Sequence, residues 1–288
     1  MTADPLRLAA LLGALGAALA GCGDDRPTLE RIREDGVVRV AYANEEPYGY
    51  LETATGRVTG EAPEIARVIL ERLGVAKIEP VVVEFDDLIP GLKAGRFDIV
   101  AAGMYVTPKR AEQIAFSNPT YVIGEGFIVK RGNPVDLHSF EDVAKHQSAR
   151  IGVMGGSVEH DYALRLGVPK DRIVVFTDYP TALVGLRNDR VDAVAATSRT
   201  VSVQLAKDDS GDFERADPFE DPVIDGEVKR GYGAFGFRRE DTALREAFDR
   251  ELAKLIGTEQ HLELVRPFGF TEVNLPGDVT AEELSAAE

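Results

Sequence analysis

Residues 103–112 combine a predicted helix start with two basic side chains. An apolar strand pattern precedes this segment, Thr107 is a typical helix N-cap, and Pro108 suits the first helical position. Lys109 and Arg110 then fall in the first turn, where the helix dipole disfavours positive charge. The arrangement is understandable if Arg110 and the free backbone N–H groups bind an anion together. The alternative is an ordinary exposed arginine that tolerates a small penalty.

Aromatic side chains gather where predicted strands of the first half of the chain end. Aromatic residues make up only 7% of the sequence, so this clustering is informative. Ligands of α/β lobes bind beyond the carboxyl ends of the strands, and we therefore expect Tyr48, Phe85 and Tyr105 in a pocket. A place in the hydrophobic core is the alternative, which fits better the phenylalanines that lie within or beside strands. The segments at these strand ends supply Glu45, Tyr48, Tyr50, Phe85, Tyr105 and Tyr121.

A glycine turn at residues 154–157 offers a second anion-binding element. It stands between a predicted strand and a predicted helix, which Ser157 is placed to cap. The backbone N–H groups around Gly156 could bind a carboxylate. The spacing is neither a dinucleotide fingerprint nor a phosphate-binding loop, so no phosphate cofactor is expected.

Two kinds of catalytic site are disfavoured. Ser157, His160 and Asp161 share one predicted helix and cannot align in series as a catalytic triad does. The remaining histidines show no metal-ligand spacing, and no metal or cofactor is expected; they are His138, His146 and His261.

Hydrophobic periodicity predicts alternating strands and helices, the pattern of mostly parallel sheets covered by helices. No short fixed period repeats, so a solenoid is not expected. The predicted strands are 37–42, 81–85, 97–102, 126–130, 150–153, 173–176, 193–196 and 231–238, and the predicted helices are 61–73, 88–94, 157–166, 180–188 and 242–256.

The segments 85–98, 103–111 and 116–121 together resemble the amino-acid-type (family 3) solute-binding proteins of ABC importers. The resemblance extends over about residues 27–272 and implies an α/β, two-lobed periplasmic-binding-protein fold of type II. It implies that Arg110 holds the carboxylate of the ligand. It also implies two crossing segments, 124–132 and 231–238, whose glycines suit hinges. The domains expected are lobe 1 at 29–127 and 235–275, lobe 2 at 128–234, and an acidic tail at 276–288.

Thr197 departs from the family pattern, in which many members place an acid that holds the α-ammonium group of the ligand. A standard α-amino acid is therefore disfavoured, and Glu45 with nearby rings is expected to meet a diffuse cation instead. Residues 44–50 and 60–66 resemble most the ectoine- and hydroxyectoine-binding branch. The ligand is thus expected to be a small zwitterionic compatible solute, and its binding residues Glu45, Tyr48, Phe85, Gly103, Tyr105, Arg110, Gly156, Ser157 and Thr197.

Other functions stay open. A polar amino-acid-binding protein of the same transporter class is the main alternative. The fold also resembles cyclohexadienyl dehydratases, for which Glu45 is an acid candidate without an obvious second acid, and a lobe pair of lytic transglycosylases, disfavoured because only an acidic tail follows residue 272. A non-enzymatic, monomeric binding protein that delivers its solute to permease subunits is expected.

Composition and the N-terminus indicate an exported protein. The 288 residues, 44% hydrophobic, allow two domains, and a net charge of −16 argues against nucleic-acid binding. Residues 8–20 have the length and composition of a signal-peptide core, and residues 19–22 resemble a lipobox that ends at Cys22, the only cysteine. We therefore expect a signal peptide over 1–21, a lipidated Cys22, a tether over 22–28, and anchoring to the outer face of the cytoplasmic membrane.

Overall fold

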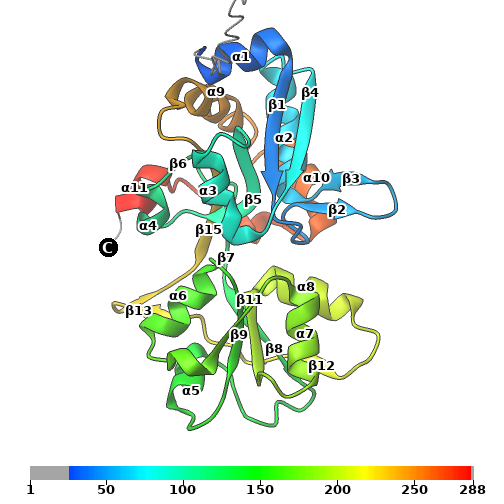
Figure 1. Ribbon diagram of the computed structural model, residues 1–288, viewed down its shortest axis with the longest axis vertical. Helices are drawn as coiled ribbons and strands as arrows, with labels where there is room; N and C mark the ends of the chain where they lie inside the picture. The colour runs from blue at the N-terminus through cyan, green and yellow to red at the C-terminus, as the bar shows by residue number, and fades with distance from the viewer. Residues whose placement is uncertain (1–25, 287–288) are drawn as a thin grey trace, which may run out of the picture.

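Two separate sheets, each covered by helices, define two lobes in the computed structural model, which describes residues 26–286 (Figure 1). The sheet of the first lobe has the strand order β4-β1-β5-β15-β6, with β7 also paired to β15. Its strands are β1 (Val37–Tyr42), β4 (Lys77–Val82), β5 (Ile99–Tyr105), β6 (Ala115–Phe116), β7 (Tyr121–Ile123) and β15 (Gly231–Phe237).

The core of the first lobe follows from the alternation of side chains along its central strand. In β5, Ile99 and Ala101 pack against one helical layer, whereas Val100 and Met104 pack on the opposite side of the sheet. Burial of a strand on both faces is typical of parallel sheets. The helices of this lobe are α1 (Thr28–Asp35), α2 (Glu61–Arg72), α3 (Leu88–Lys93), α4 (Pro108–Ala111), α9 (Thr242–Leu252), α10 (Glu259–Val265) and α11 (Ala281–Ala286), with short 3₁₀ turns η1 (Phe85–Asp87), η3 (Arg266–Phe268) and η4 (Glu272–Asn274).

The second lobe repeats this architecture around the strand order β10-β9-β11-β8-β12. Parallel pairing joins β10, β9 and β11, and β8 runs antiparallel between β11 and β12. Its elements are β8 (Glu125–Lys130), α5 (Phe140–Lys145), β9 (Ile151–Met154), α6 (Val158–Arg165), η2 (Lys170–Arg172), β10 (Ile173–Phe176), α7 (Tyr179–Arg187), β11 (Ala193–Thr197), α8 (Ser198–Lys207) and β12 (Phe213–Arg215). The predicted α/β alternation is thus confirmed in both lobes.

The chain passes between the lobes twice, at the narrow waist in Figure 1. It leaves the first sheet after β7 and enters the second with β8, and it returns just before β15. The boundaries expected after residues 127 and 234 therefore fall inside β8 and β15. Gly231 meets a close approach at its crossing: a Cβ atom there would lie 1.7 Å from the ring of Tyr105. Gly231 does not have a positive φ angle, so a glycine is needed here because of the close packing and not because of the backbone conformation.

Three segments differ from the prediction. The second strand is β4 rather than residues 81–85, and Pro80 is accommodated because β4 is an edge strand. Phe85 consequently begins the turn η1 instead of ending a strand. Part of the expected acidic tail forms α11, where Thr280 and Glu283 make a reciprocal capping box and Leu284 packs against the first lobe.

Two small hairpins project from the lobes, and they were not predicted. They are β2 (Tyr50–Glu52) with β3 (Arg57–Thr59) on the first lobe, and β13 (Val223–Ile224) with β14 (Glu227–Val228) on the second. Within residues 26–286, no helix combines the length and apolar character needed to cross a bilayer. The expected signal peptide, Cys22 and most of the tether lie outside the described residues.

Candidate ligand-binding site

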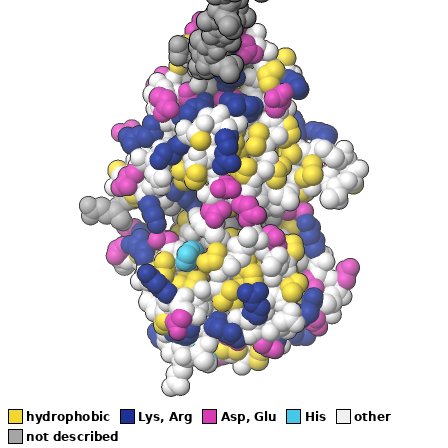
Figure 2. Space-filling model, viewed as in Figure 1, with side chains coloured by type: hydrophobic (Ala, Val, Ile, Leu, Met, Phe, Trp, Pro, Cys, Tyr) yellow, Lys and Arg dark blue, Asp and Glu magenta, His cyan; other side chains and the backbone are white. Residues whose placement is uncertain are grey.

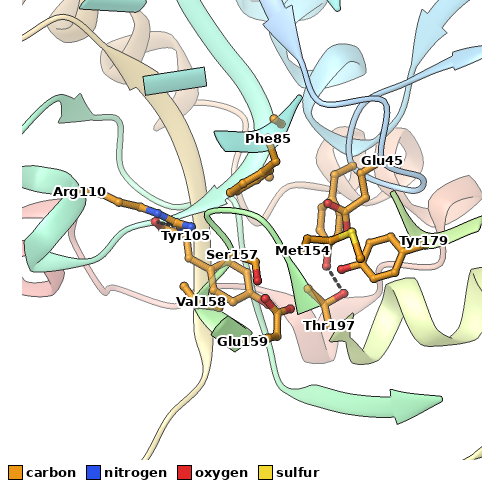
Figure 3. A pocket seen from close by; sticks show the side chains of 13 residues that line it. Glu45, Phe85, Tyr105, Arg110, Met154, Ser157, Val158, Glu159, Tyr179 and Thr197 are labelled. Atoms are coloured by element: carbon orange, nitrogen blue, oxygen red, sulfur yellow. Dashed lines mark hydrogen bonds between the residues drawn. The ribbon is translucent and has the colours of Figure 1, made fainter. Parts of the chain in front are cut away.

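A cavity lies between the two lobes, where the carboxyl ends of the central strands of both sheets meet. Its walls leave about 30 Å³ of free space, room for about two water molecules. An amino-acid-sized solute therefore enters only when the lobes move apart. Acidic side chains gather around the waist on the face shown in Figure 2. The lining residues are Glu45, Tyr48, Phe85, Ala102, Gly103, Tyr105, Arg110, Met154, Ser157, Val158, Glu159, Tyr179 and Thr197 (Figure 3).

Arg110 provides the positive charge at one end of the cavity. The Thr107 side chain caps α4 as predicted, accepting a hydrogen bond from the Arg110 backbone N–H at 3.3 Å. Arg110 is 8% exposed, and its guanidinium donates to the carbonyl oxygens of Tyr105 (2.8 Å) and Gly156 (2.9 Å). It also lies 5.3 Å from the ring centre of Phe85. Burial lowers the pKa of Arg110, but a guanidinium stays protonated and keeps further N–H donors for a carboxylate.

The opposite end carries Glu45, held by a chain of hydroxyl groups that crosses between the lobes. The Tyr48 hydroxyl donates to Thr197 Oγ1 at 2.8 Å, Thr197 donates to Thr200 Oγ1 at 3.1 Å, and Thr200 donates to Glu45 Oε1 at 2.8 Å. Thr197 also caps α8 through the Thr200 backbone N–H. Burial raises the pKa of Glu45 to about 8. The carboxyl group therefore holds its proton near neutral pH until a cation faces it.

Glu159 gives the cavity a second carboxyl group, which the sequence analysis missed. It is the second residue of α6 and is 3% exposed. Burial raises the pKa of Glu159, while its own backbone N–H, the Ser157 hydroxyl and the Arg110 charge favour the ionised form. Position 197 lacks the acid of the family pattern, and helix α6 instead supplies one to the cavity through Glu159.

Aromatic rings build the wall formed by the first lobe. Tyr48 stacks on Tyr121 with ring centres 5.3 Å apart, and the Tyr121 hydroxyl donates to the Gly103 carbonyl at 2.7 Å. Gly103 has φ of +62°, and a Cβ atom there would lie 2.4 Å from the Tyr48 ring. The glycine is therefore needed both for its backbone angle and for the close approach of Tyr48.

Most of the predicted site residues are brought together at this cavity. Gly156 does not line it, and contributes its carbonyl to Arg110 instead. Two neighbouring N–H groups of its turn bond within the lobe, from Gly155 to Phe176 and from Ser157 to Met154. The predicted residues that line the cavity are Glu45, Tyr48, Phe85, Gly103, Tyr105, Arg110, Ser157 and Thr197.

Two aromatic residues expected at the rim lie elsewhere. Tyr50 belongs to the β2–β3 hairpin, paired with Thr59, and Tyr121 stands behind Tyr48. Tyr179, at the start of α7, lines the cavity without having been predicted. It follows β10 closely, so the rule of strand carboxyl ends would have found it in the second lobe. Among residues 26–286, no cluster of histidine, cysteine, aspartate and glutamate suits a metal ion.

Two α/β lobes joined by two crossings, with a cavity of opposite charges between them, define a bilobal solute-binding protein. Residues 38–270 match the model of the bacterial extracellular solute-binding proteins, family 3. The chain belongs to this family, whose members serve ABC transporters of the amino-acid type.

Relatives of described function agree with this assignment. The chain is 37% identical over 282 residues to a probable amino-acid ABC transporter periplasmic-binding protein, y4tE, of Sinorhizobium fredii (strain NBRC 101917 / NGR234), covering 96% of this chain and 92% of the relative. The crystal structure of EhuB in complex with hydroxyectoine is similar at 36% identity and a TM-score of 0.83, covering 91% of this chain and 98% of that one.

A third similar structure is AncCDT-1, an ancestral amino-acid-binding protein described as a precursor of cyclohexadienyl dehydratase. It is 26% identical to this chain, with a TM-score of 0.72, and covers 84% of this chain and 99% of its own. This similar structure, although linked to a dehydratase, is thus itself described as an amino-acid-binding protein.

Proposed function

We propose that this protein captures ectoine or hydroxyectoine between its lobes and delivers it to an ABC permease. The main observation in support is that the guanidinium of Arg110 and the carboxyl groups of Glu45 and Glu159 line one cavity together with aromatic rings. Arg110 matches the carboxylate of such a solute, because a guanidinium binds carboxylates in a two-pronged manner. Glu45 and Glu159 match its cyclic amidinium, which has two N–H groups to donate.

The rings favour a delocalised cation over a compact ammonium group. Tyr48, Phe85, Tyr105 and Tyr179 border the cavity, and ring faces attract weakly hydrated cations by about 0.5–2 kcal/mol per contact. The similarity to the hydroxyectoine complex of EhuB supports the same ligand class.

A polar α-amino acid is the second candidate, and Glu159 is the observation that favours it. The sequence disfavours α-amino acids only because position 197 carries a threonine instead of an acid. Glu159 lines the cavity, and its carboxylate can accept from an ammonium group. The amino-acid description of the Sinorhizobium fredii relative points the same way.

Calorimetric titration of the mature protein distinguishes the two candidates. We expect measurable binding of ectoine or hydroxyectoine, with free α-amino acids at least about tenfold weaker, a gap of roughly 1.4 kcal/mol. Replacement of Tyr48, Phe85 or Tyr105 by alanine, or of Glu45 by glutamine, should weaken binding while the protein stays folded by circular dichroism. Tight binding of glutamine or arginine with no response to ectoine would establish the amino-acid alternative.

We also propose that the protein works as an exported, lipid-anchored monomer. The membership in an extracytoplasmic family supports export, and the lipobox-like residues 19–22 support lipidation of Cys22. Its partners would then be the transmembrane subunits of the permease and, through the acyl chains, the membrane surface.

A further inference from the structure

Glu125 is a buried acid directly behind the candidate site. It begins β8 and pairs in register with Thr197 of β11, so the two side chains stand on the same face of the sheet with Cβ atoms about 5 Å apart. Its side chain is 3% exposed. Its backbone N–H donates to Asp221 Oδ1 at 2.8 Å, which fixes the start of the strand at the crossing between the lobes.

The carboxyl group of Glu125 meets that of Glu159. Neither oxygen of Glu125 receives a hydrogen bond from an N–H or O–H donor among the described residues, yet the two carboxyl groups lie within hydrogen-bonding reach of each other. Two buried carboxylates in contact cannot both ionise, and one proton shared between them removes the repulsion. Contact between the two groups therefore requires a proton.

The surroundings place that proton on Glu125. Burial raises the pKa of Glu159, but its backbone N–H, the Ser157 hydroxyl and the Arg110 charge act in the opposite direction and favour its ionised form. Burial, followed by the Glu159 charge, raises the pKa of Glu125 well above its usual range. Other titratable groups that interact with the pair from neighbouring elements are Glu45, Tyr48, Tyr105, Tyr162, Tyr179 and Asp221.

We propose that Glu125 is a positioning residue that shares one proton with Glu159, and that the cationic group of the solute replaces this proton on binding. The exchange conserves charge, because one positive charge leaves for the solvent as another enters. The proton passes from Glu125 to the buffer, and the Glu159 carboxylate then faces the solute cation, with the Glu125 carboxylate directly behind it. This inference rests on the proposed function only in requiring a solute with a cationic group.

Infrared spectroscopy of the solute-free protein tests the shared proton without any ligand. At pH 7, the difference spectrum between wild type and Glu125→Gln should contain the carbonyl band of one protonated carboxylic acid. The control Glu220→Gln removes an exposed carboxylate of the same lobe and should remove only a carboxylate band. A carboxylate band alone in the Glu125→Gln difference would overturn the proposal.

Calorimetry with ectoine in buffers of different ionisation enthalpy tests the release. The slope of observed enthalpy against buffer enthalpy counts the protons released, and Glu125→Gln should release about one fewer than wild type and Glu220→Gln. Glu45 titrates separately, so the difference between variants is the informative quantity. The wild-type Kd should also fall more steeply than that of Glu125→Gln as pH rises, by up to about tenfold per pH unit for one proton.

The outcomes separate the two proposals. Equal proton release by Glu125→Gln and wild type, with ectoine bound by both, would overturn the role of Glu125 and leave the proposed function intact. Absence of ectoine binding to the wild type would instead overturn the proposed function, and the infrared result would still decide whether the proton is shared.

Discussion

At the scale of single residues, the candidate site combines a permanently charged arginine with two buried carboxyl groups whose pKa values are shifted. Arg110 is charged at all accessible pH values and is already oriented by two carbonyl groups, one from each lobe. Glu45 and Glu159 instead have raised pKa values because they are buried. In the solute-free cavity Glu45 therefore keeps its proton, and the negative charge of Glu159 is offset by nearby Arg110 and by the proton on Glu125.

Arg110 is expected to dominate affinity. Arg110→Ala should weaken solute binding by several kcal/mol, within the range of about 2–5 kcal/mol for truncating a buried charge pair. Arg110→Lys should also bind poorly, because lysine lacks the planar fork that engages both carboxylate oxygens. Calorimetry on both variants checks this, with the exposed Lys109→Ala as matched control. Near wild-type affinity for either Arg110 variant would show that its charge does not hold the solute.

Glu61 should make the protein less stable as pH rises. This side chain is 1% exposed, accepts a hydrogen bond from Thr120 at 2.6 Å, and has a pKa raised to about 8 by burial. Between the unfolded pKa near 4.5 and the folded pKa near 8, the folded state holds a proton that the unfolded state has lost. Unfolding free energy should therefore fall with rising pH in this window, by up to about 1.4 kcal/mol per pH unit for one group.

Urea titrations at pH 5, 6, 7 and 8 measure the contribution of Glu61. Glu61→Gln should show a flatter decline than wild type, since an amide does not titrate, whereas the exposed Glu84→Gln should follow wild type. Parallel pH profiles for wild type and Glu61→Gln would contradict the assignment.

At the scale of elements, local signals predicted the positions of helix starts and central strands. Thr107 and Ser157 cap α4 and α6 as expected, because capping depends on residues a few positions apart. Edge strand β4 was misplaced because Pro80 argues against a strand unless its edge position is known. Glu159 was missed for a related reason: which face of α6 meets the cavity is decided by packing between the lobes.

Contacts of α8 across the lobes should favour the closed form. Thr200 donates to Glu45, and Lys207 near the end of α8 pairs with Glu46 of the first lobe. A hydrogen bond contributes about 1 kcal/mol, so Thr200→Val should reduce the closed-to-open ratio about fivefold. Small-angle X-ray scattering of Thr200→Val without solute should then give a larger radius of gyration than wild type. The control Thr177→Val, at an exposed position, should leave the radius unchanged. An unchanged radius of gyration for the double variant Thr200→Val/Lys207→Ala would contradict the role of these contacts in lobe closure.

At the scale of the whole molecule, closure and charge act together. The cavity has room for about two waters, so capture requires an open state whose population sets the apparent affinity. The crossings at the waist carry the chain between lobes, and Glu125 begins the strand that follows the first of them. The residue proposed to respond to the charge of the solute, Glu125, therefore lies at the crossing that links the two lobes.

The N-terminal sequence leads to a prediction about the location of the mature protein. Residues 19–22 resemble a lipobox, so the mature chain should begin at an acylated Cys22 and fractionate with membranes. Two or more acyl chains are needed for stable anchoring. Cys22→Ala should release the protein or leave an uncleaved precursor, while purified Cys22→Ala protein should bind solute like wild type because the cavity is formed by distant residues. Cell fractionation and intact-mass analysis measure this, and an unmodified wild-type chain that retains Met1 would refute the lipid anchor.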